Sequence, residues 1–68
     1  MAKDRYASND GKLQAIDVIN AYNLNFNLGN IIKYTLRLGK KDDELLELDK
    51  IIDYAKFEIE RIKLERSE

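Results

Sequence analysis

The clearest alternation of apolar and polar residues along this chain runs through residues 27–39. At about 100° per residue, this segment separates into two faces of a helix. The apolar face comprises Leu28, Ile31, Ile32, Thr35, Leu36 and Leu38. The polar stripe comprises Asn30, Lys33, Tyr34 and Arg37, which follow one another at i, i+3, i+4 and i+7. Asn27 is a favourable N-cap, and Gly39 suits a left-handed C-cap, so the pattern predicts a helix over 27–39.

The segment before it predicts a shorter helix. Residues 13–22, with the sequence LQAIDVINAY, repeat apolar side chains at helical spacing. Three asparagines then interrupt the period between 23 and 27, and asparagine favours turns and helix caps. A connection of three to five residues is typical of neighbouring antiparallel helices, so the two segments predict a helical hairpin.

The C-terminal segment, residues 43–66, contains no Gly or Pro and predicts one long helix of roughly 35 Å. Apolar residues recur along it in steps of three and four, which is a heptad pattern. We call these residues the seam: Leu45, Leu48, Ile52, Ala55, Ile59 and Ile62. A single hairpin is too short to cover the seam and the apolar residues beside it. We therefore expect the seam to be the interface of a homodimer or higher homo-oligomer.

Length and composition favour the same assembly. The chain has 68 residues and lacks both Cys and His, so disulfides and the usual zinc sites are excluded. A domain this small usually needs a disulfide, a structural metal or a partner chain for stability. Association with further copies is the option that this composition leaves. The sequence thus predicts a single all-α domain over 1–68, a short helical hairpin plus a long C-terminal amphipathic helix, assembled as a homo-oligomer. Without a leader-like or membrane-spanning apolar run, we expect a soluble cytoplasmic protein with no membrane partner, metal or cofactor.

Charge is distributed unevenly although the net charge is only −1. Residues 42–68 carry ten acids and five bases. Residues 26–41 carry no acid and four bases: Lys33, Arg37, Lys40 and Lys41. Four local bases suit one or two phosphate groups and are too few for strong non-specific binding of nucleic acid. We therefore predict a small anionic ligand and regard nucleic acid as an unlikely partner.

The polar stripe supplies the groups that such a ligand needs. An arginine can grip a phosphate bidentately and a lysine adds a point charge. The tyrosine ring can stack on a base, and the asparagine can hydrogen-bond a base edge or ribose. The predicted ligand-binding residues are Asn30, Lys33, Tyr34, Arg37, Gly29, Lys40, Lys41, Tyr6 and Asn9. Gly29 is included because a glycine in the first turn lets a ligand approach backbone N–H groups. The competing interpretation is a merely solvated helix face.

The polar segment 1–12 has two interpretations. It contains a turn signal, Ser8-Asn9-Asp10-Gly11, and is typical of a flexible N-terminal arm. The alternative is an arm that folds over a ligand and contributes Tyr6 and Asn9.

Catalytic machinery is difficult to assign. Acids at Glu44, Glu47, Asp49 and Asp53 superficially resemble the magnesium-binding helices of all-α nucleotide pyrophosphohydrolases. The second acidic helix of such enzymes is missing, so we interpret these residues as capping acids on a solvated helix. No phosphate-binding loop of the G-x-x-x-x-G-K-[ST] type occurs, and no general base stands out. We predict no catalytic residue.

The residues Ile16-Asp17-Val18-Ile19, the run Leu24–Tyr34 and Arg37 together resemble a small phage family. That family, domain of unknown function 3310, carries an I-D-V-I segment and a G-N-x-x-K-Y-x-x-R helix. Some of its members are described as nucleotide kinases. This chain departs from the family pattern at Glu47, where Asp is preferred, and at Arg5, where a His precedes the tyrosine. The resemblance implies a phage origin, a helical fold and a connection with nucleotides.

Together these observations predict a phage nucleotide-binding protein that acts without catalysis in the cytoplasm of an infected bacterial host. Its expected role is to capture and sequester a nucleotide-derived host immune signal, of the ADP-ribose or cyclic-nucleotide type. Two alternatives remain open at this point. One is a nucleotide kinase or other nucleotide-processing enzyme, and the other is a small interaction module that inhibits a host protein.

Overall fold

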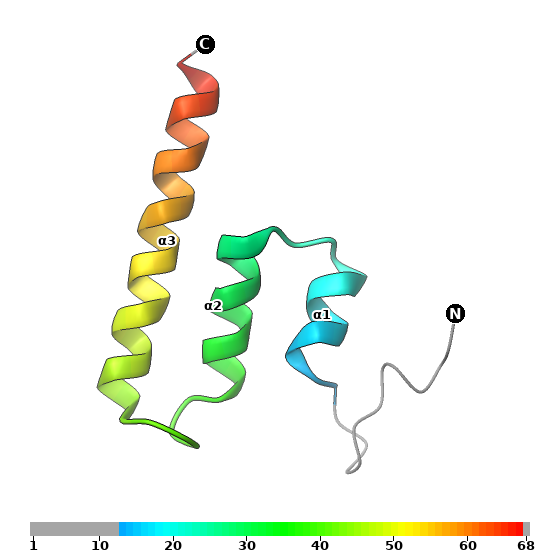
Figure 1. Cartoon of the computed structure of the whole chain (residues 1–68), viewed down its shortest axis with the longest axis vertical. Coiled ribbons are helices and arrows are strands. Elements are labelled where there is room, and N and C mark those ends of the chain that lie inside the picture. The colour runs from blue at the N-terminus through cyan, green and yellow to red at the C-terminus, as the bar shows by residue number, and fades with distance from the viewer. Residues whose placement is uncertain (1–12, 68) are drawn as a thin grey trace.

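The computed structural model describes residues 13–67, and this part of the chain forms three helices and no strand. They are α1 (Ala15–Ala21), α2 (Phe26–Leu36) and α3 (Glu44–Arg66). Figure 1 shows them side by side, with α2 between α1 and the lower part of α3. The all-helical prediction and the long C-terminal helix are confirmed.

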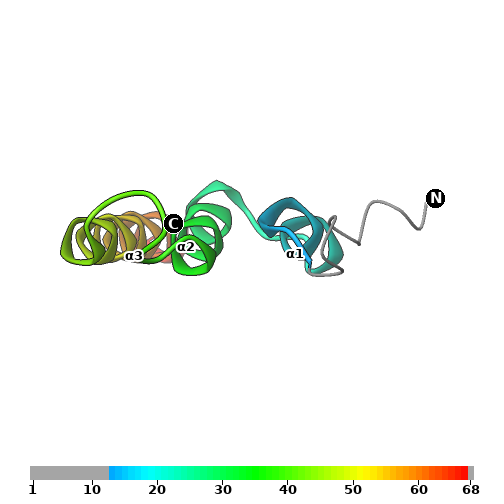
Figure 2. The same cartoon turned by 90° about the horizontal axis from the view of Figure 1, so that it is seen from below.

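The helices form a single layer. The principal extents of the molecule are 44 × 34 × 9 Å, and Figure 2 shows the three helices in one row when viewed from below. The shortest extent is close to the 8–10 Å between two packed helix axes, so the layer is one helix thick. A layer of this kind leaves two broad faces uncovered.

Helix α2 begins earlier than the sequence pattern predicts. Its N-cap is Asn25 rather than Asn27, because the Asn25 side-chain oxygen accepts a hydrogen bond of 2.9 Å from the Leu28 N–H. The preceding Asn23 has a φ of 54°, which reverses the chain between α1 and α2. Asparagine tolerates this left-handed conformation better than most residues, so the asparagine-rich segment forms the predicted turn.

Helix α2 also ends earlier than predicted, with Arg37 at the C-cap in place of Gly39. Gly39 does adopt the left-handed conformation expected of it, with a φ of 75°, but it does so in the loop between α2 and α3. There its N–H donates a 3.0 Å hydrogen bond to Glu47 of α3. The glycine therefore shapes the loop and joins it to the next helix.

The kinds of side chain that are buried are the reverse of those in an ordinary small domain. Among residues 13–67 no hydrophobic side chain is buried, whereas three acids are: Asp17, Glu47 and Glu58. The seam of α3 lies open, with Leu45 72% exposed and Ile59 51% exposed. Hydrophobic burial is normally the main force in folding, so this layer lacks a conventional apolar core.

Candidate ligand-binding site

A pocket of about 420 Å³ opens between the start of α1 and the end of α2. Its apolar part comes from α1 and α2, and four basic side chains complete it. The lining residues, which we call the basic pocket, are Leu13, Gln14, Ala15, Lys33, Leu36, Arg37, Lys40 and Lys41. The structure thus gathers all four bases of residues 26–41 around one hollow, and no acid of the described residues 13–67 lines it. This volume falls within the usual range for small-molecule sites.

The four bases differ in how far they are already neutralised. Arg37 approaches Asp42 and Glu47, each at 3.8 Å. Lys33, Lys40 and Lys41 make no ion pair with other residues of the segment 13–67. The lysines therefore carry the positive potential of the pocket, while acids near the start of α3 partly offset the arginine.

Tyr34 lies on the other side of α2, against α3. Its ring stacks on Tyr54 with centroids 6.1 Å apart and an interplanar angle of 22°. Three cations surround the ring: Lys33 at 5.0 Å, Lys50 at 5.3 Å and Arg37 at 5.4 Å from its centroid. These distances suit cation–π attraction. Lys33 and Arg37 thus belong both to the basic pocket and to this aromatic cluster.

The aromatic cluster extends further along α3. Phe26 meets Tyr54 edge-on at 5.9 Å, and Phe57 meets the same ring edge-on at 5.6 Å. Phe26 is 74% exposed, so a flat ring from solution can reach the edge of the cluster. Tyr54 itself packs against both α2 aromatics, Phe26 and Tyr34.

Two other predicted site residues have structural partners instead. Gly29 is buried against α1, where an added methyl group would lie 3.2 Å from Ile19 Cδ1. Its N–H donates to the Asn25 carbonyl at 2.8 Å, so the backbone access expected there does not exist. Asn30 donates to the Phe26 carbonyl at 2.9 Å and does not line the basic pocket. Tyr6 and Asn9 lie outside the described residues.

Glu47 corrects the interpretation of the α3 acids as solvated caps. Its side chain is fully buried, and it accepts the Gly39 N–H at 3.0 Å. Its second oxygen faces Arg37 Nε at 3.8 Å, and both of these buried atoms lack a hydrogen-bond partner. Sequence reasoning missed this contact because Glu47 looks like any acid in a first helical turn. The helix N-cap is Asp43, which accepts the Leu45 N–H at 3.0 Å.

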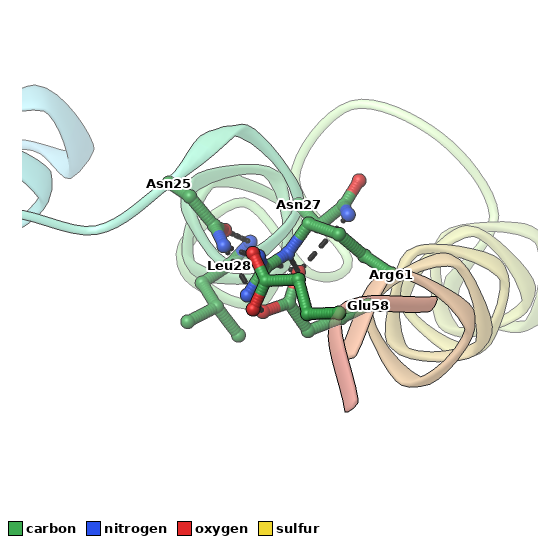
Figure 3. A network of polar contacts seen from close by, with 6 residues as sticks. Asn25, Asn27, Leu28, Glu58 and Arg61 are labelled. Atoms are coloured by element: carbon green, nitrogen blue, oxygen red, sulfur yellow. Dashed lines mark hydrogen bonds and ion pairs between the residues drawn. The ribbon is translucent and has the colours of Figure 1, made fainter. Parts of the chain in front are cut away.

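Glu58 organises the opposite end of the α2–α3 interface, as Figure 3 shows. Its carboxylate accepts hydrogen bonds from the side chains of Asn25 and Asn27 at 3.0–3.1 Å. Arg61 donates to it bidentately, at 3.1 and 2.7 Å. The Arg61 hydrogen bond, followed by those of the two asparagines, lowers the pKa of Glu58 to about 2. This charged anchor holds α2 on α3 together with the aromatic contacts of Tyr54.

No group of three potential metal-ligating side chains occurs in the part of the chain from residue 13 to residue 67. None of its helices is both long enough and apolar enough to cross a membrane.

The fold and site define a small helical chain with a basic hollow between α1 and α2. Residues 4–56 match the model of a family of proteins of unknown function, DUF3310, and the chain belongs to that family. The match includes the whole of α1 and α2 and the first half of α3. Comparisons with curated proteins and with solved structures find no match.

Proposed function

We propose that this protein binds a small nucleotide-like anion in the basic pocket and sequesters it without changing it. The observation that carries the proposal is the convergence of Lys33, Arg37, Lys40 and Lys41 on one hollow, in a lining to which residues 13–67 contribute no acid. Like charges repel, so such a cluster is costly unless an anion neutralises it. A phosphorylated ligand supplies that charge and accepts hydrogen bonds from each lysine.

The lining of the pocket also favours a ligand with an apolar or ring-shaped part. Leu13, Ala15 and Leu36 provide the apolar wall. The exposed ring of Phe26 lies on α2, the same helix as Lys33, and Lys33 and Arg37 also approach the Tyr34 ring. A base or ribose can rest on apolar and aromatic side chains while its phosphates meet the lysines.

The chemistry of the lining supports capture without catalysis. Among residues 13–67, the side chains that line the pocket are aliphatic, amide or basic, without a carboxylate, thiol, imidazole or hydroxyl group. General-base and nucleophilic mechanisms use mainly those groups. We extend the proposal to a role in phage infection, in which the bound molecule is a nucleotide-derived host immune signal.

We also propose that the protein works as a homo-oligomer assembled through the seam. The exposed apolar side chains of α3 support this, since a solvent-exposed heptad pattern is unfavourable in an isolated chain. An Ile52→Asp variant is expected to become monomeric or to unfold, because an unpaired carboxylate is costly to bury.

The ligand proposal is tested by titration calorimetry against a fixed panel. The panel contains nucleoside mono- and triphosphates, ADP-ribose derivatives and cyclic dinucleotides. We expect Lys33→Ala to weaken binding of the best ligand by about 1.5–3 kcal/mol, the range for a hydrogen bond to a charged group. Lys63→Ala is the matched control, because Lys63 lies on α3 outside the pocket and is 70% exposed. Equal binding by wild type and Lys33→Ala contradicts the site assignment.

Chromatography of each ligand after incubation distinguishes capture from the two alternatives. Unchanged ligand that elutes with the protein supports sequestration. A chemically altered product identifies an enzyme and contradicts the proposal. Absence of both binding and turnover across the panel leaves a protein-binding module as the better description.

A further inference from the structure

We propose that a second copy of this chain packs on the seam of α3 with its own α3 antiparallel, so that two layers form one core. The proposal goes beyond ligand binding and does not depend on it. It specifies the face, the orientation and the register of the contact.

The seam occupies one broad face of the layer. Three residues of α3 mark the side that meets α2: Glu47 contacts the α2–α3 loop, Tyr54 contacts Tyr34, and Glu58 contacts Asn25. At about 100° per residue, the seam is turned from that side by roughly a quarter turn. Figure 2 shows that a quarter turn from the α2 side of α3 is a broad face of the layer.

The aromatic cluster marks the opposite broad face. Tyr54 is in edge-on contact with both Phe26 and Phe57, and Phe57 lies about half a turn around α3 from the centre of the seam. On α2, Lys33 and Arg37 share the side of Phe26, whereas Leu28 and Thr35 lie on the other side. The seam face therefore continues onto the apolar side of α2, and the cations and aromatics lie on the reverse.

A partner is needed because the single layer contains no apolar core. No hydrophobic side chain of residues 13–67 is buried, although the seam residue Ile52 is 49% exposed beside Leu45 and Ile59. A chain of this size buries little surface on its own, so it is stable only when most of its apolar surface is removed from water. A second layer at the usual 8–10 Å helix spacing buries this face on both copies at once. A second copy presents the same face, so it fits without any further chain.

An antiparallel arrangement pairs every seam residue across the two α3 helices. Leu45 then lies opposite the partner's Ile62, Leu48 opposite the partner's Ile59, and Ile52 opposite the partner's Ala55. The two-fold axis passes between Ile52 and Ala55, where a large side chain meets a small one on each side. Such alternation of large and small residues is favourable in a packed core.

The charges beside the seam select this orientation. Asp49 and Lys56 lie on the outer flank of the seam, while Ile51 and Glu58 lie on the flank covered by α2. In the antiparallel arrangement, Asp49 of each copy meets the partner's Lys56, which makes two attractive pairs. In a parallel arrangement Asp49 instead lies near the partner's Glu44, and like charges repel.

Single cysteine variants test the orientation cleanly, because the natural chain contains no Cys. Asp49→Cys and Lys56→Cys proteins are mixed under reducing conditions, allowed to exchange and then oxidised. Residues 49 and 56 are about 10.5 Å apart along one helix, too far for a disulfide within one chain. We expect the mixture to give a cross-linked dimer at least about tenfold faster than either variant alone, because only the mixture places two thiols within reach.

Leu48→Cys alone is the matched control. It forms a disulfide with its own counterpart in a parallel arrangement and faces the partner's Ile59 in the antiparallel one. Rapid cross-linking of Leu48→Cys alone overturns the proposal. A folded wild-type monomer in sedimentation at micromolar concentration also overturns it, whether or not the protein binds a nucleotide.

Charge exchange provides an independent measurement. Asp49→Lys is expected to raise the dissociation constant of the dimer about tenfold, since two attractive pairs become repulsive. The double variant Asp49→Lys with Lys56→Asp is expected to return it to within about threefold of wild type. Failure of the second change to rescue the first contradicts the antiparallel pairing, and both proteins can be checked for helicity by circular dichroism.

Discussion

Asn25 joins two helices through the two ends of one side-chain amide. Its oxygen accepts the Leu28 N–H at 2.9 Å and caps α2. Its nitrogen donates to both carboxylate oxygens of Glu58 on α3, at 3.1 and 3.0 Å. The N-cap residue of α2 is therefore hydrogen-bonded to a residue 33 positions later in the chain.

The double role of Asn25 predicts unequal effects of two similar substitutions. Asn25→Ala removes a helix cap, worth about 0.5–2 kcal/mol, and also a hydrogen bond to a charged group. Asn27→Ala removes only a hydrogen bond to Glu58, of 3.1 Å. We expect Asn25→Ala to lower the free energy of unfolding by about 1 kcal/mol more than Asn27→Ala does. Urea unfolding at one fixed protein concentration measures the difference, and equal losses contradict the capping role.

The Glu58 network predicts a dependence of stability on pH. Its pKa lies at about 2 against an ordinary value of 4.5, because Arg61 and the two asparagines stabilise the charged form. The native state therefore holds this proton less tightly than the unfolded chain does. The stabilisation is complete above about pH 4.5 and is lost as the pH falls toward about 2.

Thermal melts between these two pH values, followed by circular dichroism, test this dependence. Other acids titrate in the same range, so the relevant quantity is the difference in melting temperature between wild type and Glu58→Gln. We expect this difference to shrink steadily on acidification. A difference that is constant with pH shows that Glu58 does not act through its charge.

The sequence pattern predicted those parts of the structure that follow from local periodicity. Three helices, the exposed seam of α3 and the gathering of Lys33 and Arg37 with the loop lysines Lys40 and Lys41 are all present. These features depend on spacing along one helix or on the adjacent loop. Helical spacing and the adjacent loop therefore account for the basic side chains of the pocket but not for the wall formed by Leu13, Gln14 and Ala15.

The features that sequence reasoning missed depend on contacts between helices. The start of α2 lies at Asn25, which caps the helix and pairs with Glu58, and the buried Glu47 contacts the loop containing Gly39. Tyr34 does not line the pocket with Lys33 and Arg37, because its ring stacks on Tyr54 of α3. Gly29 contacts Ile19 because α1 folds back on α2. None of these partners lies within one helical turn of the residue concerned, so periodicity contains no signal for them.

Arg37 and Glu47 provide the last prediction, because the arginine belongs both to the basic pocket and to a buried acid. Their closest approach is 3.8 Å, with the Glu47 side chain fully buried and that of Arg37 31% exposed. Removal of the arginine leaves a buried carboxylate without its cation, which is destabilising. Arg37→Ala is therefore expected to lower the free energy of unfolding by about 1–3 kcal/mol, even without any ligand.

A double-mutant cycle measures the coupling between the two side chains. Glu47→Leu removes the buried charge. In that background, Arg37→Ala is expected to lower the free energy of unfolding by about 1 kcal/mol less than it does in the wild-type protein. Lys40→Ala is the matched control for the pocket, because Lys40 lines the same hollow without contacting a buried acid. It is expected to weaken ligand binding while changing the free energy of unfolding by less than about 0.5 kcal/mol. An additive cycle shows that the 3.8 Å approach carries no energetic coupling, and it restricts Arg37 to a role in the pocket.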